Sequence, residues 1–158
     1  MPRLMRQANR EVTDRGEVDA IILKASICRL GMVEDGRPYI VPMNFGYDGA
    51  CLYFHCAREG RKIDVLRRSP AVCFELEVDH GLLTGELACQ CTNDFESVMG
   101  EGIAEMIEEG PSKRAALDII MAHYSKGPFH YDEKSLGLTT IIRVRICELR
   151  AKRHLKRA

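Results

Sequence analysis

Tryptophan is absent from this 158-residue chain, and aromatic residues make up only 6% of it. Proteins that hold single-stranded nucleic acids stack bases on aromatic side chains, so a platform of that kind is not expected here. An excess of charge of one sign is also missing, because 23 lysines and arginines balance 23 aspartates and glutamates. Without a broad basic face, we expect no nucleic-acid partner.

Long hydrophobic runs are missing as well. No stretch approaches the ~18 consecutive apolar residues that a membrane-spanning helix needs, so we expect no membrane partner. The charged start of the chain, residues 1–7, is not followed by the apolar core of a signal peptide. These absences favour a cytoplasmic protein, and a chain of 158 residues is most simply one domain.

The chain also lacks the common phosphate-binding signatures and the usual zinc spacing. Neither G-x-G-x-x-G nor G-x-x-x-x-G-K-[ST] occurs, which excludes Rossmann and P-loop sites on motif grounds. Seven cysteines are scattered mostly through strand-like runs, a pattern more typical of reduced thiols than of a disulfide framework. Cys89-x-Cys91 is the only tight pair, its spacing is not that of a zinc knuckle, and we therefore expect no metal site.

What the sequence does contain is a distinctive stretch from Pro38 to Arg68. Two segments rich in aromatic and β-branched residues, 38–47 and 50–57, flank Asp48-Gly49, a pair typical of β-hairpins. A turn at Gly60-Arg61-Lys62 follows and opens an apolar-periodic helix. Free backbone N–H groups at a helix start, beside two cations, make a seat for a phosphate. We therefore predict that this hairpin and turn hold a phosphorylated cofactor.

The remaining segments alternate between helix and strand signals. Helices are expected over 14–25, where Asp14 and Glu17 have the form of a capping box, and after Pro111. Gly100 and Gly102 indicate a bulge or a close approach of another backbone or a ligand. Further strands are expected over 27–33, 71–78, 95–107 and 138–147, and loops over 79–87 and 125–137.

Strands that follow one another through hairpins, with two or three helices between them, indicate a mainly β fold. We predict a small antiparallel barrel of about six strands with helices on its flanks. A doubly wound sheet would need strands to alternate regularly with helices, and they do not. We expect a loosely held arm over residues 1–10, one domain over 11–148 and an exposed basic tail over 149–158.

Three segments in combination resemble the flavin-binding split-barrel proteins related to pyridoxamine 5′-phosphate oxidase. They are Pro42-x-Asn44-Phe45-Gly46-Tyr47, Tyr53-Phe54-His55-x-Ala57-x-x-Gly60-Arg61-Lys62 and Ser97-Val98-x-Gly100-x-Gly102. The similarity runs from about residue 10 to residue 147 and is greatest to the branch that includes the nitroimidazole-resistance proteins. It implies a homodimer of split barrels with FMN, or FAD in its place, at the subunit interface.

The resemblance also implies where the flavin would lie. Arg61 and Lys62 would hold the cofactor phosphate. The strand Val41-Pro42-Met43-Asn44 would run past the edge of the isoalloxazine ring, where backbone groups and the Asn44 amide can hydrogen-bond it.

Other contacts come from two later strands. His55, Cys56 and Ala57 would line the ribityl and phosphate region, and Ser97 and Val98 would approach the flavin from the later strand. In the nitroimidazole-resistance branch the histidine of this motif faces the small-molecule pocket, so His55 is the candidate for substrate contact.

The chain departs from the oxidase pattern in three places. It has no tryptophan and ends soon after its last expected strand, whereas the oxidase needs a C-terminal Arg/Trp-containing segment and a substrate phosphate clamp. Oxidation of vitamin B6 is therefore not expected. Asn44 stands where the oxidase has a lysine, and Cys56 stands where family members usually have a serine, which puts a thiol beside the expected phosphate site.

Three hypotheses follow. The first is an FMN-dependent oxidoreductase that passes hydride through flavin N5 to a small organic molecule, by analogy a nitro compound, with NAD(P)H as a candidate electron donor. The second is a non-catalytic flavin- or haem-binding protein that senses redox state or stores cofactor, and the third is a dimeric interaction module with an empty pocket. Taken singly, Arg61 and Lys62 could be solvated charges, and His55, Asn44 and Ser97 structural polar groups.

Overall fold

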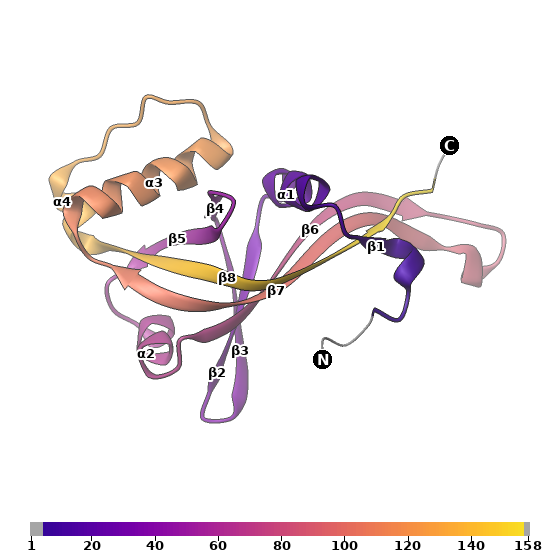
Figure 1. Cartoon of the computed structure of the whole chain (residues 1–158), viewed down its shortest axis with the longest axis horizontal. Coiled ribbons are helices and arrows are strands. Elements are labelled where there is room, and N and C mark those ends of the chain that lie inside the picture. Colours follow the sequence, from indigo (N-terminus) through magenta and orange to yellow (C-terminus); the bar gives the residue numbers. More distant parts are fainter. Residues whose placement is uncertain (1–4, 157–158) are drawn as a thin grey trace.

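The strands of the chain form one antiparallel sheet with helices at its flanks (Figure 1). The structure is a computed structural model and describes residues 5–156. In the sheet the strands are ordered β3-β2-β6-β7-β8-β5-β4, and β1 pairs with the side of β8. The strands are β1 (Glu11–Val12), β2 (Cys28–Glu34), β3 (Arg37–Met43), β4 (Gly46–Tyr47), β5 (Cys51–Ala57), β6 (Ala71–Leu83), β7 (Thr92–Ile107) and β8 (Thr139–His154).

The helices cover different parts of this sheet. α1 contacts β6 and β7, α2 contacts β2, and α3 contacts β4 and β5. None of the helices in residues 5–156 is long and apolar enough to cross a membrane. The mainly β class with flanking helices is confirmed, with eight strands rather than about six. The helices are α1 (Arg15–Lys24), α2 (Arg61–Arg68), α3 (Gly110–Tyr124) and α4 (Glu133–Leu138), with 3-10 turns η1 (Ala8–Arg10) and η2 (Ala88–Gln90).

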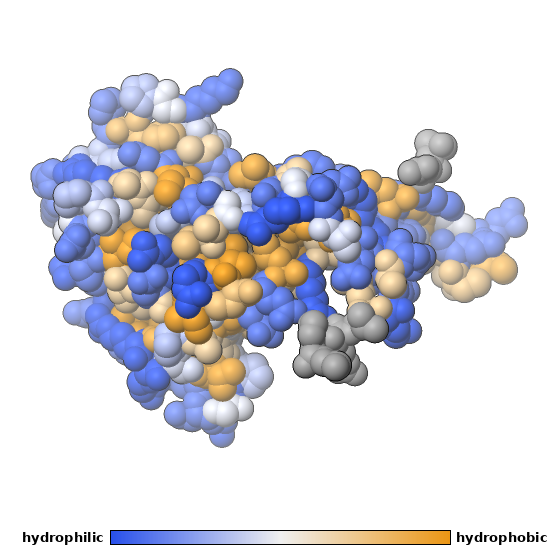
Figure 2. Space-filling view, in the orientation of Figure 1, coloured by the Kyte–Doolittle hydropathy of each residue, from blue (hydrophilic) through white to orange (hydrophobic). Residues whose placement is uncertain are grey.

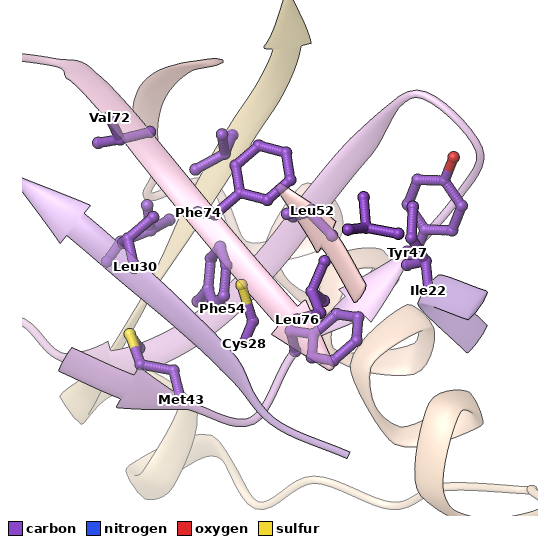
Figure 3. Packing of buried hydrophobic residues seen from close by; sticks show 14 of the residues in the cluster. Ile22, Cys28, Leu30, Met43, Tyr47, Leu52, Phe54, Val72, Phe74 and Leu76 are labelled. Atoms are coloured by element: carbon purple, nitrogen blue, oxygen red, sulfur yellow. The ribbon is translucent and has the colours of Figure 1, made fainter. Parts of the chain in front are cut away.

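The hydrophobic core lies on the inner face of the sheet. Cys28 is paired with Met43 on one side and with Leu76 on the other, and Leu76 is paired in turn with Val98. All four side chains are buried. Figure 3 shows Cys28, Met43 and Leu76 packed with neighbouring core side chains. Burying one such side chain contributes about 1.5–3 kcal/mol, so this row of residues fixes the register of four adjacent strands.

A helix cap at Asp14 and a hairpin turn at Asp35-Gly36 form where the local sequence favours them. The Asp14 carboxylate accepts a hydrogen bond from the Glu17 N–H at 2.9 Å and begins α1. Asp35 and Gly36, with φ of 49° and 77°, form the turn that joins β2 to β3. Two consecutive left-handed residues are what a tight hairpin turn requires, and an Asp-Gly pair supplies them at low cost.

The expected hairpin between residues 38–47 and 50–57 forms only in part. β3 ends at Met43 and pairs with β2, and only Gly46–Tyr47 pairs with β5. The chain turns between them because Phe45 is fully buried, with its N–H donating to the Tyr124 hydroxyl at 2.9 Å. At Gly46, α3 passes so close that a Cβ atom would come within 2.6 Å of the Ile120 nitrogen.

Two segments that were expected to be a loop and a tail belong to strands. β6 continues to Leu83, because a bulge between Asp79 and Gly81, where φ is 105°, lets the ladder with β7 resume. β8 continues to His154, paired with β7 on one side and with β1 on the other. Of the expected tail, residues 149–154 therefore lie in the sheet, where Ala151 is buried, and residues 157–158 lie outside the described residues. Of the expected arm, residues 8–10 form η1 and residues 1–4 lie outside the described residues.

Candidate functional site

The start of α2 forms a corner with β3 and the end of β5. β5 ends at Ala57, and Gly60, with φ of 124°, precedes the first helical residue, Arg61. Gly60 supplies no side chain to cap the helix. The first N–H groups of an α-helix have no partner within the helix, and the positive end of the helix dipole lies beside them. The corner therefore offers backbone donors to an anion.

Arg61, the first predicted phosphate ligand, is bound to other parts of the corner. Its Nε and Nη2 atoms both lie 2.7 Å from Glu34 Oε2, and its guanidinium lies 4.1 Å from the centre of the Tyr39 ring. Arg68 Nη2 binds the other Glu34 oxygen at 3.0 Å. The hydrogen bond from Arg61 is the main reason that the pKa of Glu34 lies below its usual value. The Glu34 carboxylate thus already neutralises the charge of Arg61.

Lys62, the second predicted ligand, is in a different situation. Its side chain is half-buried, and its Nζ atom lies 3.5 Å from the Met43 sulfur, which is a weak acceptor. None of the ion pairs within residues 5–156 involves Lys62. Burial raises the pKa of the neighbouring Cys56 thiol, although the Lys62 charge acts against that rise. A half-buried ammonium without a carboxylate is a ready partner for an anion.

The other predicted residues of β5 alternate between the two faces of the strand. His55 and Ala57 are exposed, whereas Cys56 between them is half-buried and packs against the core. β8 pairs with this segment, with Ile141 opposite His55. His55 therefore points away from the core, as a residue that contacts a bound molecule must.

The predicted residues of β3 alternate in the same way. Val41 and Met43 pack against the core, whereas Pro42 and Asn44 are exposed. Pro42 lies opposite Arg29 of β2. The structure thus brings the end of β3 to the start of α2 through the contact between Lys62 and Met43, and it leaves the Asn44 amide accessible.

Ser97 and Val98 are not part of this corner. The Val98 side chain is fully buried in the core, opposite Leu76 of β6 and Ala151 of β8. Ser97, on the other face of β7, is half-buried and lines a groove on the outer face of the sheet. Alternation along a strand sends neighbouring side chains to opposite faces, so only one of the two can approach a ligand with its side chain.

The outer-face groove has a volume of about 840 Å³ and lies across β2, β3, β6, β7 and β8. Its apolar members include Ile40 and Met99, whose side chains are 63% and 61% exposed. Figure 2 shows hydrophobic residues gathered over the middle of the molecule, where β7 and β8 cross β2 and β3. The residues that line the groove are Met5, Arg29, Gly31, Ile40, Cys73, Phe74, Glu75, Ser97, Met99, Gly100, Glu101, Glu148, Arg150 and Lys152.

The cysteine pair lies away from both features. Cys89 and Cys91 are exposed at η2, which lies between β6 and β7 at the tip of the arm that these two strands form (Figure 1). Within residues 5–156 no three side chains of the metal-binding types come together in a cluster.

Comparison with known proteins identifies a family and several similar structures. A model of the pyridoxamine 5′-phosphate oxidase family matches residues 14–153. The crystal structure of a candidate 5-nitroimidazole antibiotic resistance protein from Bacteroides thetaiotaomicron is 37% identical, with a TM-score of 0.81 over 90% of this chain and 85% of that one. An uncharacterised protein of Rhizobium meliloti, RA0666, is 32% identical over 65 residues, which are 41% of this chain and only 42% of that protein's length.

Two more distant structures share the fold. The flavocytochrome Anf3 from Azotobacter vinelandii has a TM-score of 0.85 at 23% identity, over 97% of this chain and 73% of that one. An FAD- and haem-binding protein from Mycobacterium smegmatis has a TM-score of 0.84 at 19% identity, over 93% and 74% of the two chains.

Proposed function

We propose that this chain, which belongs to the pyridoxamine 5′-phosphate oxidase family, binds a flavin, and specifically holds the phosphate of FMN at the corner between α2, β3 and β5. The observation that carries the proposal is Lys62, a half-buried ammonium at an uncapped helix start that makes no ion pair within residues 5–156. A phosphate would satisfy both the ammonium and the backbone N–H groups. Two fold relatives, a flavocytochrome and an FAD- and haem-binding protein, support a flavin in general.

The residues around the corner fit the rest of a flavin nucleotide. Cys56 and Ala57 lie on the strand that leads into the corner, and Pro42 and Asn44 present backbone and amide groups beside it. A bound flavin supplies the redox chemistry, and the protein binds and orients it. His55, exposed on β5, would contact a small organic substrate, for which a nitro compound is the candidate by family analogy.

The proposal includes a homodimer in which a second copy covers the outer-face groove. The groove combines exposed apolar side chains, Ile40 and Met99, with charged residues, such as Arg29, which is paired with Glu75 at 2.9 Å. An apolar patch with a charged rim is typical of a protein–protein interface. Such an interface would bring Ser97 of one copy toward the flavin bound at the corner of the other copy. Ser97 would then contact a flavin although it lies away from the corner of its own copy.

The alternative is a flavin- or haem-binding protein that turns over no substrate. The names of the flavocytochrome and of the FAD- and haem-binding relative support a flavin or a haem as the bound group. The visible spectrum of the purified protein separates flavin from haem, because haem gives a Soret band. Reduction of bound flavin by NAD(P)H and its reoxidation by a nitroaromatic compound would then distinguish an enzyme from a sensor.

The phosphate assignment is tested with Lys62→Ala. A charge-assisted hydrogen bond contributes about 1.5–3 kcal/mol, so we expect Lys62→Ala to weaken FMN binding about 10- to 100-fold, with a larger loss when Arg61 is replaced as well. Binding is measured by quenching of flavin fluorescence. Riboflavin, which has no phosphate, should bind equally to the variant and the unmodified chain.

Arg67→Ala serves as the matched control. Arg67 is an exposed cation of the same helix and forms no ion pair within residues 5–156, so its replacement changes the net charge equally without touching the corner. Equal FMN affinities for Lys62→Ala and Arg67→Ala would rule out the proposed phosphate site.

A further inference from the structure

Glu34 binds the guanidinium N–H groups of Arg61 that a phosphate would need. It is the last residue of β2, and its carboxylate receives Nε and Nη2 of Arg61 on one oxygen, both at 2.7 Å. The other oxygen receives Nη2 of Arg68 at 3.0 Å. Arg61 and Arg68 are the first and last residues of α2, so one carboxylate binds both ends of the helix.

The geometry at Arg61 leaves little freedom while Glu34 is bound. The guanidinium stacks over the Tyr39 ring at 4.1 Å and turns its Nε–Nη2 edge to Glu34. This edge carries two parallel N–H groups, and carboxylate and phosphate oxygens bind such an edge in the same manner. Arg61 therefore cannot offer this edge to a cofactor phosphate until Glu34 has released it.

We propose that Glu34 is an internal competitor of the cofactor phosphate for Arg61. A phosphate that binds beside Lys62 takes over the Nε–Nη2 edge of Arg61, and Glu34 keeps Arg68 as its partner. This inference rests on the proposed function of the corner. Glu34 thereby sets how tightly the chain holds a phosphorylated flavin.

Arg68 lowers the free-energy cost of moving Arg61 from Glu34 to the phosphate. Because Arg68 already binds the other oxygen of Glu34, the carboxylate is not left without a charged partner when Arg61 moves to the phosphate. Without Arg68, releasing Arg61 would leave Glu34 beside an incoming phosphate of the same sign. Arg68 therefore favours the release of Arg61 from Glu34, and its replacement should make that release less favourable.

The test measures the affinities for FMN and riboflavin in three variants. Glu34→Gln removes the competing charge, and we expect it to tighten FMN binding about three- to tenfold. Arg68→Gln removes the fallback partner and should weaken FMN binding. Asp35→Asn is the control, because it removes the same charge at the position next to Glu34. The Asp35 side chain, unlike that of Glu34, forms no ion pair within residues 5–156. The affinity for riboflavin should stay the same in all three.

Two results would overturn the competition. If Glu34→Gln weakens FMN binding, Glu34 orients Arg61 for the phosphate and does not compete with it. If Glu34→Gln and Asp35→Asn bind FMN equally, Arg61 does not exchange partners.

Failure of the proposed function gives a different result, because the unmodified chain would then bind neither FMN nor riboflavin, or Lys62→Ala and Arg67→Ala would bind FMN equally. In that case the Nε resonance of Arg61 is followed by NMR during a titration with inorganic phosphate. Competition requires this resonance to shift at a lower phosphate concentration in Glu34→Gln than in the unmodified chain. Identical titration curves would refute it.

Discussion

At the scale of single residues, the most deeply buried charged residue within residues 5–156 is Glu96. This residue of β7 is 1% exposed, and its carboxylate binds Lys24 of α1 at 3.1 Å, His80 of β6 at 3.0 Å and Arg153 of β8 at 2.8 Å. Burial raises the pKa of this carboxyl, but the hydrogen bonds from these three side chains outweigh that effect and leave the pKa below its usual value. Glu96 therefore joins four elements while it is ionised.

Glu96→Gln should destabilise the fold by about 3 kcal/mol, because it leaves a cluster of cations without their buried counter-charge. Unfolding in urea measures the loss. Glu86→Gln is the control, since Glu86 is exposed and makes no ion pair within residues 5–156, and it should change the stability by less than about 0.5 kcal/mol.

The stabilisation that Glu96 contributes should depend on pH in a direction that follows from its lowered pKa. A carboxyl whose pKa is lowered by folding stabilises the folded state fully above the unfolded pKa of about 4.3, and this contribution is lost as the pH falls through the lower folded pKa. The stability difference between the unmodified chain and Glu96→Gln should therefore narrow below pH 4. A constant difference from pH 7 to pH 3 would contradict the assignment.

Local residue spacing singles out Arg61 and Lys62 as candidate ligands, but it does not single out Glu34 or Glu96. Arg61 and Lys62 stand out because two cations at a helix start are unfavourable without an anion. Glu34 is 27 residues from Arg61, and Glu96 is 72 residues from Lys24, so no local pattern links them. Ion pairs between residues so far apart in the sequence can be inferred only once the pairing of the strands is known.

At the scale of elements, capping residues and turn residues were reliable guides. Pro111 lies in the first turn of α3, as expected. The six-residue helix α4 was missed because it is too short to show a period, although Asp132 caps it by accepting the Ser135 N–H at 3.0 Å. The extensions of β6 and β8 were missed because polar residues of an exposed strand look like those of a loop.

Gly100 and Gly102 were expected to mark a bulge or a close approach, and both occur. The register between β7 and β8 shifts between Glu101 and Gly102. A Cβ atom at Gly100 would come within 2.3 Å of the Phe74 ring, and one at Gly102 within 2.6 Å of the Arg145 carbonyl oxygen. The absent side chains therefore let three strands approach each other.

Gly100→Ala should lower the free energy of unfolding by about 1–3 kcal/mol, because the new methyl group displaces the buried Phe74 ring. Thermal unfolding measures the change. Gly137→Ala is the matched control, since a Cβ atom there meets nothing within 4 Å and alanine favours the helix that contains it. If both variants were as stable as the unmodified chain, the close packing at Gly100 would be wrong.

At the scale of the whole molecule, the sheet has two ends, β3 and β4, and one apolar outer groove. The mainly β class was predictable from alternating runs and hairpin turns. The strand order was not, because β5 pairs with β8 rather than with β3, and two other strands and three α-helices lie between β5 and β8 in the sequence.

The proposed dimer predicts a loss of association when charges enter the groove. Ile40→Glu together with Met99→Glu should convert a dimer to a monomer, because two buried carboxylates without partners would be costly. Light scattering coupled to size-exclusion chromatography measures the mass, and Leu138→Glu, which alters another exposed apolar residue, should leave it unchanged. A double variant that remains dimeric would place the interface elsewhere.

The position of β8 has a consequence for biosynthesis. A nascent chain leaving the ribosome can assemble β2, β3, β6 and β7 as soon as residue 107 has emerged, whereas β5 has only the two residues of β4 to pair with until residues 139–154 follow. During that interval both β5 and the free edge of β7 are open to strands of neighbouring chains. The time taken to translate residues 108–154 thus sets how long this edge stays unprotected.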